Sequence, residues 1–247
     1  AFVQTYLTKL RPAPDDDWRN DVAVREAYFD RLWTFAQRLT PVHNSLKAHV
    51  LHHRLASDHA KGVYDPQRFL TYLKLPRSLP YVSRKHLALE DSRRFPADLS
   101  VDYSAGTLLP PIGNDEPLVR SYLAHFLVDA ANTKDYESYI DETYLKHLFA
   151  ETKIVNGLGE PEQWASLLPP ELFRQLKDRV DIDFAPTNRT HYAVDQPVTL
   201  EVFVKNAPTL IVKVFEINTG NYYRTELREI DTDINLDGLV ANEENTH

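Results

Sequence analysis

The chain has 247 residues, of which 43% are hydrophobic and 11% aromatic, and its formal net charge is −8. This composition allows one or two packed domains. The negative charge argues against nucleic acid as a partner, because phosphate contacts need a basic surface. The absence of cysteine excludes disulfides, thiolate metal sites and cysteine nucleophiles.

No apolar run in the sequence approaches the ~18–20 residues that a helix needs to span a membrane, so no membrane span is predicted. The first residues also lack the basic region and the long apolar region of a signal peptide. The sequence contains no methionine. We therefore expect the chain to be part of a longer protein.

The first 180 residues are predicted to form a helical domain. Residues 1–17 are expected to be an extended arm, because Pro12 and Pro14 interrupt any helix and the aspartates that follow offer a cap. Apolar residues then recur at three- and four-residue steps, as they do on one face of a helix. This spacing predicts helices at residues 18–39, 41–61, 65–75, 114–127, 136–156, 161–168 and 170–180.

Residues 76–113 interrupt this helical pattern. Five prolines in this segment disfavour long helices. We expect an irregular strap over the helices, which serves either packing or function, as long irregular connections do.

Near Val180 the period of the apolar residues changes from about 3.6 to 2, which predicts strands. Alternation marks residues 180–184 and 198–204, and residues 222–230 are a further candidate strand. Residues 210–217 are apolar on both faces, as in a strand that is buried on both sides.

These patterns predict an α+β chain with two domains. An N-terminal all-helical domain, residues 1–180, is followed by a partial antiparallel β-sandwich, residues 181–247. The second domain is expected to be truncated, because three or four strands rarely form a stable sandwich alone.

Residues 233–244 read DINLDGLVANEE and fit the calcium-loop pattern D-x-N-x-D-G-x5-E. In this pattern Gly238 occupies the position where the backbone must turn sharply. The expected calcium ligands are the side chains of Asp233, Asn235, Asp237 and Glu244 and the backbone carbonyl of Leu239.

A turn without an ion is the alternative interpretation of this loop. Ile234 and Leu236 stand where such loops usually carry polar residues, and no room for a following helix remains before His247. Residues such as Asp, Asn and Gly also form turns by themselves, because they tolerate positive φ angles.

Other catalytic patterns are weak. His49 and His53 lie one helical turn apart and could form a metal pair, but Val50 stands where a zinc protease carries its glutamate base. No G-x-S-x-G elbow and no glycine-rich phosphate loop occurs. These observations favour a chain that is not an enzyme.

Residues from about 180 to 244 contain the run DIDFAPTNRTHYAVDQPVTLEVFVKNAPTLIVKVFEINTGNYYR. A tyrosine-containing segment, a short proline turn and a V-x-L-x-V strand follow one another. This order resembles the macroglobulin-like β-sandwich domains of the alpha-2-macroglobulin family, especially the large bacterial ones. The resemblance implies an extracytoplasmic, multidomain protein that traps or contacts proteases. The thioester of that family needs a cysteine, which this chain lacks.

The sequence and the resemblance together predict a non-enzymatic structural or protein-interaction module of a larger macroglobulin-like protein. Its expected partner is another protein or the remainder of its own parent chain. The first alternative is a calcium-dependent binding module that uses the loop at residues 233–244. The second alternative is a metal-dependent hydrolase that uses His49 and His53.

Overall fold

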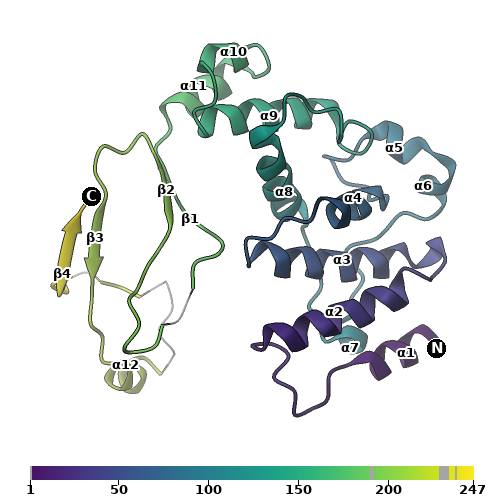
Figure 1. Cartoon of the computed structure of the whole chain (residues 1–247), viewed down its shortest axis with the longest axis horizontal. Coiled ribbons are helices and arrows are strands. Elements are labelled where there is room, and N and C mark those ends of the chain that lie inside the picture. Colours follow the sequence, from purple (N-terminus) through teal and green to yellow (C-terminus); the bar gives the residue numbers. More distant parts are fainter. Residues whose placement is uncertain (1, 190–191, 228–233, 237) are drawn as a thin grey trace. The chain divides into compact units, whose positions relative to one another are not determined.

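The computed structural model describes residues 2–189, 192–227, 234–236 and 238–247 (Figure 1). The first part of the chain is helical. Its elements are α1 (Phe2–Leu10), α2 (Val22–Ala36), the 3-10 helix η1 (Pro41–His43), α3 (Asn44–His59), α4 (Pro66–Lys74), α5 (Arg84–Ala88), α6 (Glu90–Arg94), α7 (Ser104–Thr107), α8 (Glu116–Asp129), α9 (Glu142–Val155), α10 (Pro161–Ala165) and α11 (Pro170–Asp178).

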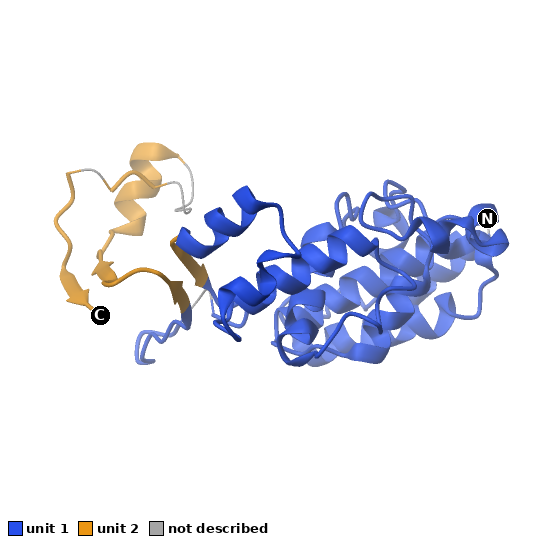
Figure 2. Ribbon diagram, turned by 90° about the horizontal axis from the view of Figure 1, so that it is seen from above, with its two compact units in different colours: residues 1–179, 184–202 blue, residues 180–183, 203–247 orange. Residues whose placement is uncertain are grey.

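Two compact units make up the chain (Figure 2). The helical unit comprises residues 1–179 and 184–202, and the β unit comprises residues 180–183 and 203–247. An N-terminal helical region followed by short antiparallel strands confirms the predicted fold class.

Aspartate caps fix the starts of three helices. The side chains of Asp21, Asp65 and Asp141 each accept hydrogen bonds from the second and third backbone N–H groups of α2, α4 and α9. A cap of this kind stabilises a helix by about 1 kcal/mol. Pro66, directly after Asp65, begins α4 as the sequence predicts. Proline is favoured at this position because a backbone N–H group in the first turn would have no partner within the helix, so its absence costs nothing.

The core of the helical unit lies between α3, α4, α8 and α9. Phe69, Tyr72 and Tyr122 are fully buried there, and Phe69 stacks on Tyr122 with ring centroids 5.0 Å apart. A second cluster joins α1, α2 and α3 around Leu7, and Trp33 packs against both clusters. The burial of these aromatic side chains supplies the main stabilisation of the unit.

The N-terminal arm is a helix, so the prediction of an extended segment is wrong. Leu7 of α1 is fully buried, and Val3 and Leu10 pack around it. These three residues lie at i, i+4 and i+7 and so share one helical face. Pro12 ends the helical segment without preventing it, because the proline constrains only its own turn and the residue before it.

Short strands form the β unit and its link to the helices. β1 (Asp181–Phe184) pairs with β2 (Val202–Lys205) in one two-stranded sheet, and β3 (Ile211–Val214) pairs with β4 (Glu243–Thr246) in another. The β3–β4 pair is antiparallel, with Ile211 opposite Thr246 and Val214 opposite Glu243. Strands in residues 180–184, 198–204 and 210–217 are thus confirmed, although each is shorter than predicted.

Two details of the β prediction are wrong. Residues 219–226 form the helix α12 (Thr219–Glu226), because the Asn218 side chain caps the N–H of Asn221 at 2.9 Å. β3 is also exposed along its length, with Ile211 54% and Val214 46% accessible. A strand is buried on both faces only where further layers cover it, and the described part of the β unit supplies no such layer over β3.

Candidate functional site

A buried carboxylate organises the centre of the helical unit. Asp115, directly before α8, is fully buried and pairs with Arg77, whose Nε lies 3.1 Å from Oδ2. The hydroxyl of Tyr72 donates to Oδ2 at 2.6 Å, and that of Tyr81 donates at 2.8 Å. Arg77 also donates from Nη1 to the carbonyls of Tyr72 and Leu75. The cluster therefore ties α4, the segment after it and the start of α8 together.

The chemistry of this Asp115 cluster is structural. Burial raises the pKa of Tyr72 and of Tyr81, so both phenols stay protonated and remain donors. The Arg77 guanidinium also lies over the Tyr72 ring, 4.2 Å from its centroid. Every charged oxygen of Asp115 is engaged by these donors, so the carboxylate is not available as a base.

No pattern in the sequence indicates this cluster beyond the position of Asp115 at a helix start. Arg77, Tyr72 and Tyr81 lie far from Asp115 in the chain, and no spacing rule connects them. In the sequence, Arg77 between Pro76 and Ser78 looks like an ordinary charged residue of an exposed loop. Only the packing of α4 against the start of α8 reveals that Arg77 is buried and paired with Asp115.

Hydrogen bonding fixes the tautomer of His49, which is 1% exposed on α3. Thr107 uses its hydroxyl hydrogen to bond the Tyr103 carbonyl at 3.0 Å, so its oxygen must accept from His49 Nε2–H at 3.1 Å. The Nδ1 atom of His49 is buried and has no partner among the described residues. Burial, followed by the charge of His53, lowers the pKa of His49 to about 3.

The same reasoning argues against His49 and His53 as a metal pair. His53 Nε2 lies 2.8 Å from the Pro110 carbonyl, which can only accept, so this nitrogen carries a proton. Both Nε2 atoms are therefore engaged with α7 and the segment after it. Within the described residues, no group of three or more histidine, aspartate or glutamate side chains is arranged to hold a metal ion.

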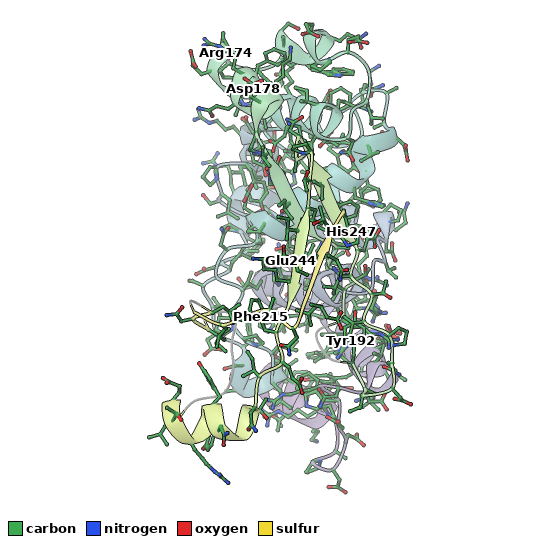
Figure 3. All side chains as sticks on the ribbon, turned by 90° about the vertical axis from the view of Figure 1, so that its left-hand side faces the viewer. Arg174, Asp178, Tyr192, Phe215, Glu244 and His247 are labelled. Carbon is green, nitrogen blue, oxygen red and sulfur yellow. The ribbon has the colours of Figure 1, made fainter. Side chains whose placement is uncertain are left out.

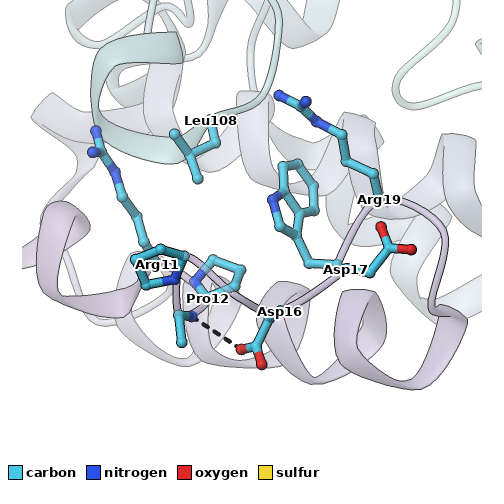
Figure 4. A pocket seen from close by; sticks show the side chains of 9 residues that line it. Arg11, Pro12, Asp16, Asp17, Arg19 and Leu108 are labelled. Atoms are coloured by element: carbon cyan, nitrogen blue, oxygen red, sulfur yellow. Dashed lines mark hydrogen bonds between the residues drawn. The ribbon is translucent and has the colours of Figure 1, made fainter.

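A hollow of about 390 Å³ lies beside the loop between α1 and α2 (Figure 4). Arg11, Asp16, Arg19 and Leu108 are among its lining residues. Arg11 donates to the Ala105 and Gly106 carbonyls of α7, and Asp16 accepts from the Ala13 N–H at 3.0 Å. The Arg11 bonds attach the loop to α7, and the Asp16 bond closes a turn within the loop, so these polar groups hold the loop in place.

The predicted calcium loop lies partly outside the described residues, since Asp233 and Asp237 are not described. Gly238 has φ +84°, which fits the sharp turn expected at that position. Glu244 lies in β4 opposite Lys213, and its Oε2 is 3.4 Å from the Lys213 ammonium (Figure 3). Asn235 and Leu239 are described, but the two aspartates with which they would share the ion are not.

Calcium binding by Asp233, Asn235, Asp237, Leu239 and Glu244 stays a prediction. If the loop binds calcium, calorimetric titration of the full chain should show submillimolar affinity, and Asp233→Ala should abolish the binding. Lys213→Ala should strengthen the binding, because it frees Glu244 from its ion pair. Absence of heat and of any thermal shift at millimolar calcium would leave an ordinary turn.

The architecture defines a modular protein, in which a helical domain precedes short antiparallel strands of a second domain. Residues 1–180 match the family model of the Actin-binding protein F N-terminal domain. Residues 210–247 match the model of the AbpF first immunoglobulin-like domain. The chain therefore belongs to the Actin-binding protein F N-terminal domain family.

One curated relative is Actin-binding protein F of Dictyostelium discoideum, which is 34% identical over 248 residues. The match covers 99% of this chain but only 10% of the relative, so the chain spans about a tenth of that protein. No solved structure matches the chain at a significant level. Across the part of the chain that the structure describes, no helix has both the length and the apolar character to cross a membrane.

The family match overturns the resemblance to macroglobulin-like domains and the functions drawn from it. The structure gives a physical reason: of the V-x-L-x-V residues at 198–202, only Val202 belongs to a strand. Tyr192 lies outside any strand, and its hydroxyl bonds the Thr199 carbonyl at 2.6 Å. The family match also overturns the two alternative functions, a calcium-dependent binding module and a metal-dependent hydrolase. The extracytoplasmic location had no support besides this resemblance.

Proposed function

We propose that the helical unit of this chain binds actin. The observation that carries the proposal is the family match over residues 1–180, supported by a relative that is named Actin-binding protein F and aligns with 99% of the chain. The relative's name describes a protein about ten times longer, so the assignment of actin binding to this segment is our own.

The geometry of the helical unit agrees with a role in binding a macromolecule. Its buried polar groups around Asp115 are engaged with one another, and the polar groups of the hollow beside Arg11 are engaged with their own domain. What remains for a partner is the outer surface of the helices. An actin filament is large enough to provide the contact area that a stable interface with these helix faces needs.

Sedimentation with actin filaments tests the proposal directly. We expect the full chain to pellet with filaments in a saturable manner, and to be displaced when the unlabelled chain is added in excess. Hydrogen exchange of the complex should then show protection within residues 2–179. A chain that stays folded yet remains in the supernatant at every filament concentration would contradict the proposal.

A further inference from the structure

The exposed face shared by α1 and α2 combines aromatic and cationic side chains. Along α1, Phe2, Tyr6 and Lys9 lie at i, i+4 and i+7 and share one side of the helix. Along α2 and the turn after it, Arg31, Phe35 and Arg38 have the same spacing. We call these six residues the α1–α2 face.

Aromatic packing joins the two halves of the α1–α2 face. The rings of Tyr6 and Phe35 stack with centroids 4.5 Å apart, although Tyr6 is still 40% exposed and Phe2 is 72% exposed. A hollow of about 300 Å³ lies beside this pair, and its other walls are formed by Leu10, Asp30, Arg31, Thr34 and Arg38. Exposed aromatic residues beside a hollow are typical of interaction surfaces, where they act as anchors.

The charges of the α1–α2 face are not balanced by its surroundings. Within the described residues, no carboxylate forms an ion pair with Lys9, Arg31 or Arg38. The nearby Asp30, which also lines the hollow, is already paired with Arg54 of α3. Arg31 donates to the Leu10 carbonyl at 3.4 Å and lies over the Tyr28 ring, and neither contact neutralises its charge. A cationic face on a chain of net charge −8 is therefore a local feature, and cations without a carboxylate partner at a hollow attract a partner of negative charge.

We propose that the α1–α2 face binds an acidic protein segment that carries an apolar side chain. The apolar side chain enters the hollow beside Tyr6 and Phe35, and carboxylates on either side of it meet Lys9, Arg31 and Arg38. This inference rests on the proposed function, because the partner that we assign to the face is an acidic segment on the actin filament. An anionic membrane is disfavoured as the partner, because the other surfaces of an acidic chain are repelled by anionic lipid.

The test compares two variants that change the net charge by the same amount. In the first, Lys9→Glu, Arg31→Glu and Arg38→Glu reverse the α1–α2 face. In the second, Arg84→Glu, Lys85→Glu and Arg93→Glu reverse exposed cations of α5 and α6. We expect the first variant to bind filaments at least about tenfold more weakly than the unchanged chain at low salt, and the second to bind within about twofold.

A third variant separates the apolar part of the contact from the charges. Tyr6→Ser together with Phe2→Ser should also weaken binding, but with little change in its salt dependence. Thermal unfolding followed by circular dichroism checks that every variant is folded. The substituted side chains are at least partly exposed, so the fold is expected to persist.

The outcomes separate this inference from the proposed function. If the unchanged chain binds filaments and both charge variants bind equally well, the inference is overturned while actin binding stands. Equal losses in both charge variants would show unspecific attraction and would also overturn it. If the unchanged chain ignores filaments but binds vesicles of phosphatidylserine through the α1–α2 face, both the inference and the proposed function fail.

Discussion

Replacement of Arg77 by methionine is expected to lower the free energy of unfolding by about 3–5 kcal/mol. The substitution leaves the Asp115 carboxylate fully buried without its cation, with only the hydroxyls of Tyr72 and Tyr81 as donors. An uncompensated buried charge costs far more than the lost attraction alone. Urea unfolding followed by circular dichroism measures the change.

Two further variants make this result specific to the buried pair. Arg84→Met removes an exposed arginine from α5 and should change stability by less than about 0.5 kcal/mol. The double variant Arg77→Met with Asp115→Leu should recover part of the loss, since no buried charge then remains. A loss below about 1 kcal/mol in Arg77→Met would mean that Asp115 is neutralised in another way.

Acidification from pH 7 to pH 5 is expected to lower the free energy of unfolding by about 2 kcal/mol for each of His49 and His52. Burial, followed by the charge of His53, lowers the pKa of His49 to about 3 and that of His52 to about 4, from an ordinary 6.5. Asp102 acts in the opposite direction on His49, and Asp115 does so on His52.

The direction of this pH effect follows from which state takes up the protons. Below pH 6.5 the unfolded chain protonates these two rings and the native chain does not, so stability falls as the pH falls towards 4. Above pH 6.5 both states hold neutral rings, and this contribution is constant. Urea midpoints measured across this pH range report the effect.

His49→Gln isolates the part of the pH effect that belongs to His49. Glutamine keeps an N–H donor for the Thr107 hydroxyl but does not titrate. About 2 kcal/mol of the acid-induced loss should therefore disappear in this variant. His125→Gln, at an exposed position on α8, controls for the removal of one imidazole. An unchanged acid response in His49→Gln would show that this ring is protonated in the folded chain.

Local signals made most of the helical unit predictable from its sequence. Pro66, Asp65 and the positive-φ Gly62 mark helix boundaries because each acts on the backbone next to it. The sequence does contain a signal for α1, because Val3, Leu7 and Leu10 share one helical face. Pro12 and Pro14 disfavour a helix only in their own turn, so the helix ends before them.

The remaining features depend on tertiary structure and had no local signal. The pairing of Arg77 with Asp115 arises from the packing of α4 against the start of α8, which no residue spacing specifies. The exposure of β3 depends on which layers cover it, and a strand pattern contains no such information. Residues 222–226 have strand-like composition, but the cap at Asn218 starts a helix there, so a local bond outweighs the propensity.

The placement of Trp33 between the two aromatic clusters has a practical consequence for spectroscopy. All three tryptophans of the chain, at positions 18, 33 and 164, belong to the helical unit. Intrinsic indole emission therefore reports the unfolding of that unit alone, whereas the amide circular dichroism signal includes both units. A difference between the two melting curves measures how far the units unfold independently, without any label or truncation.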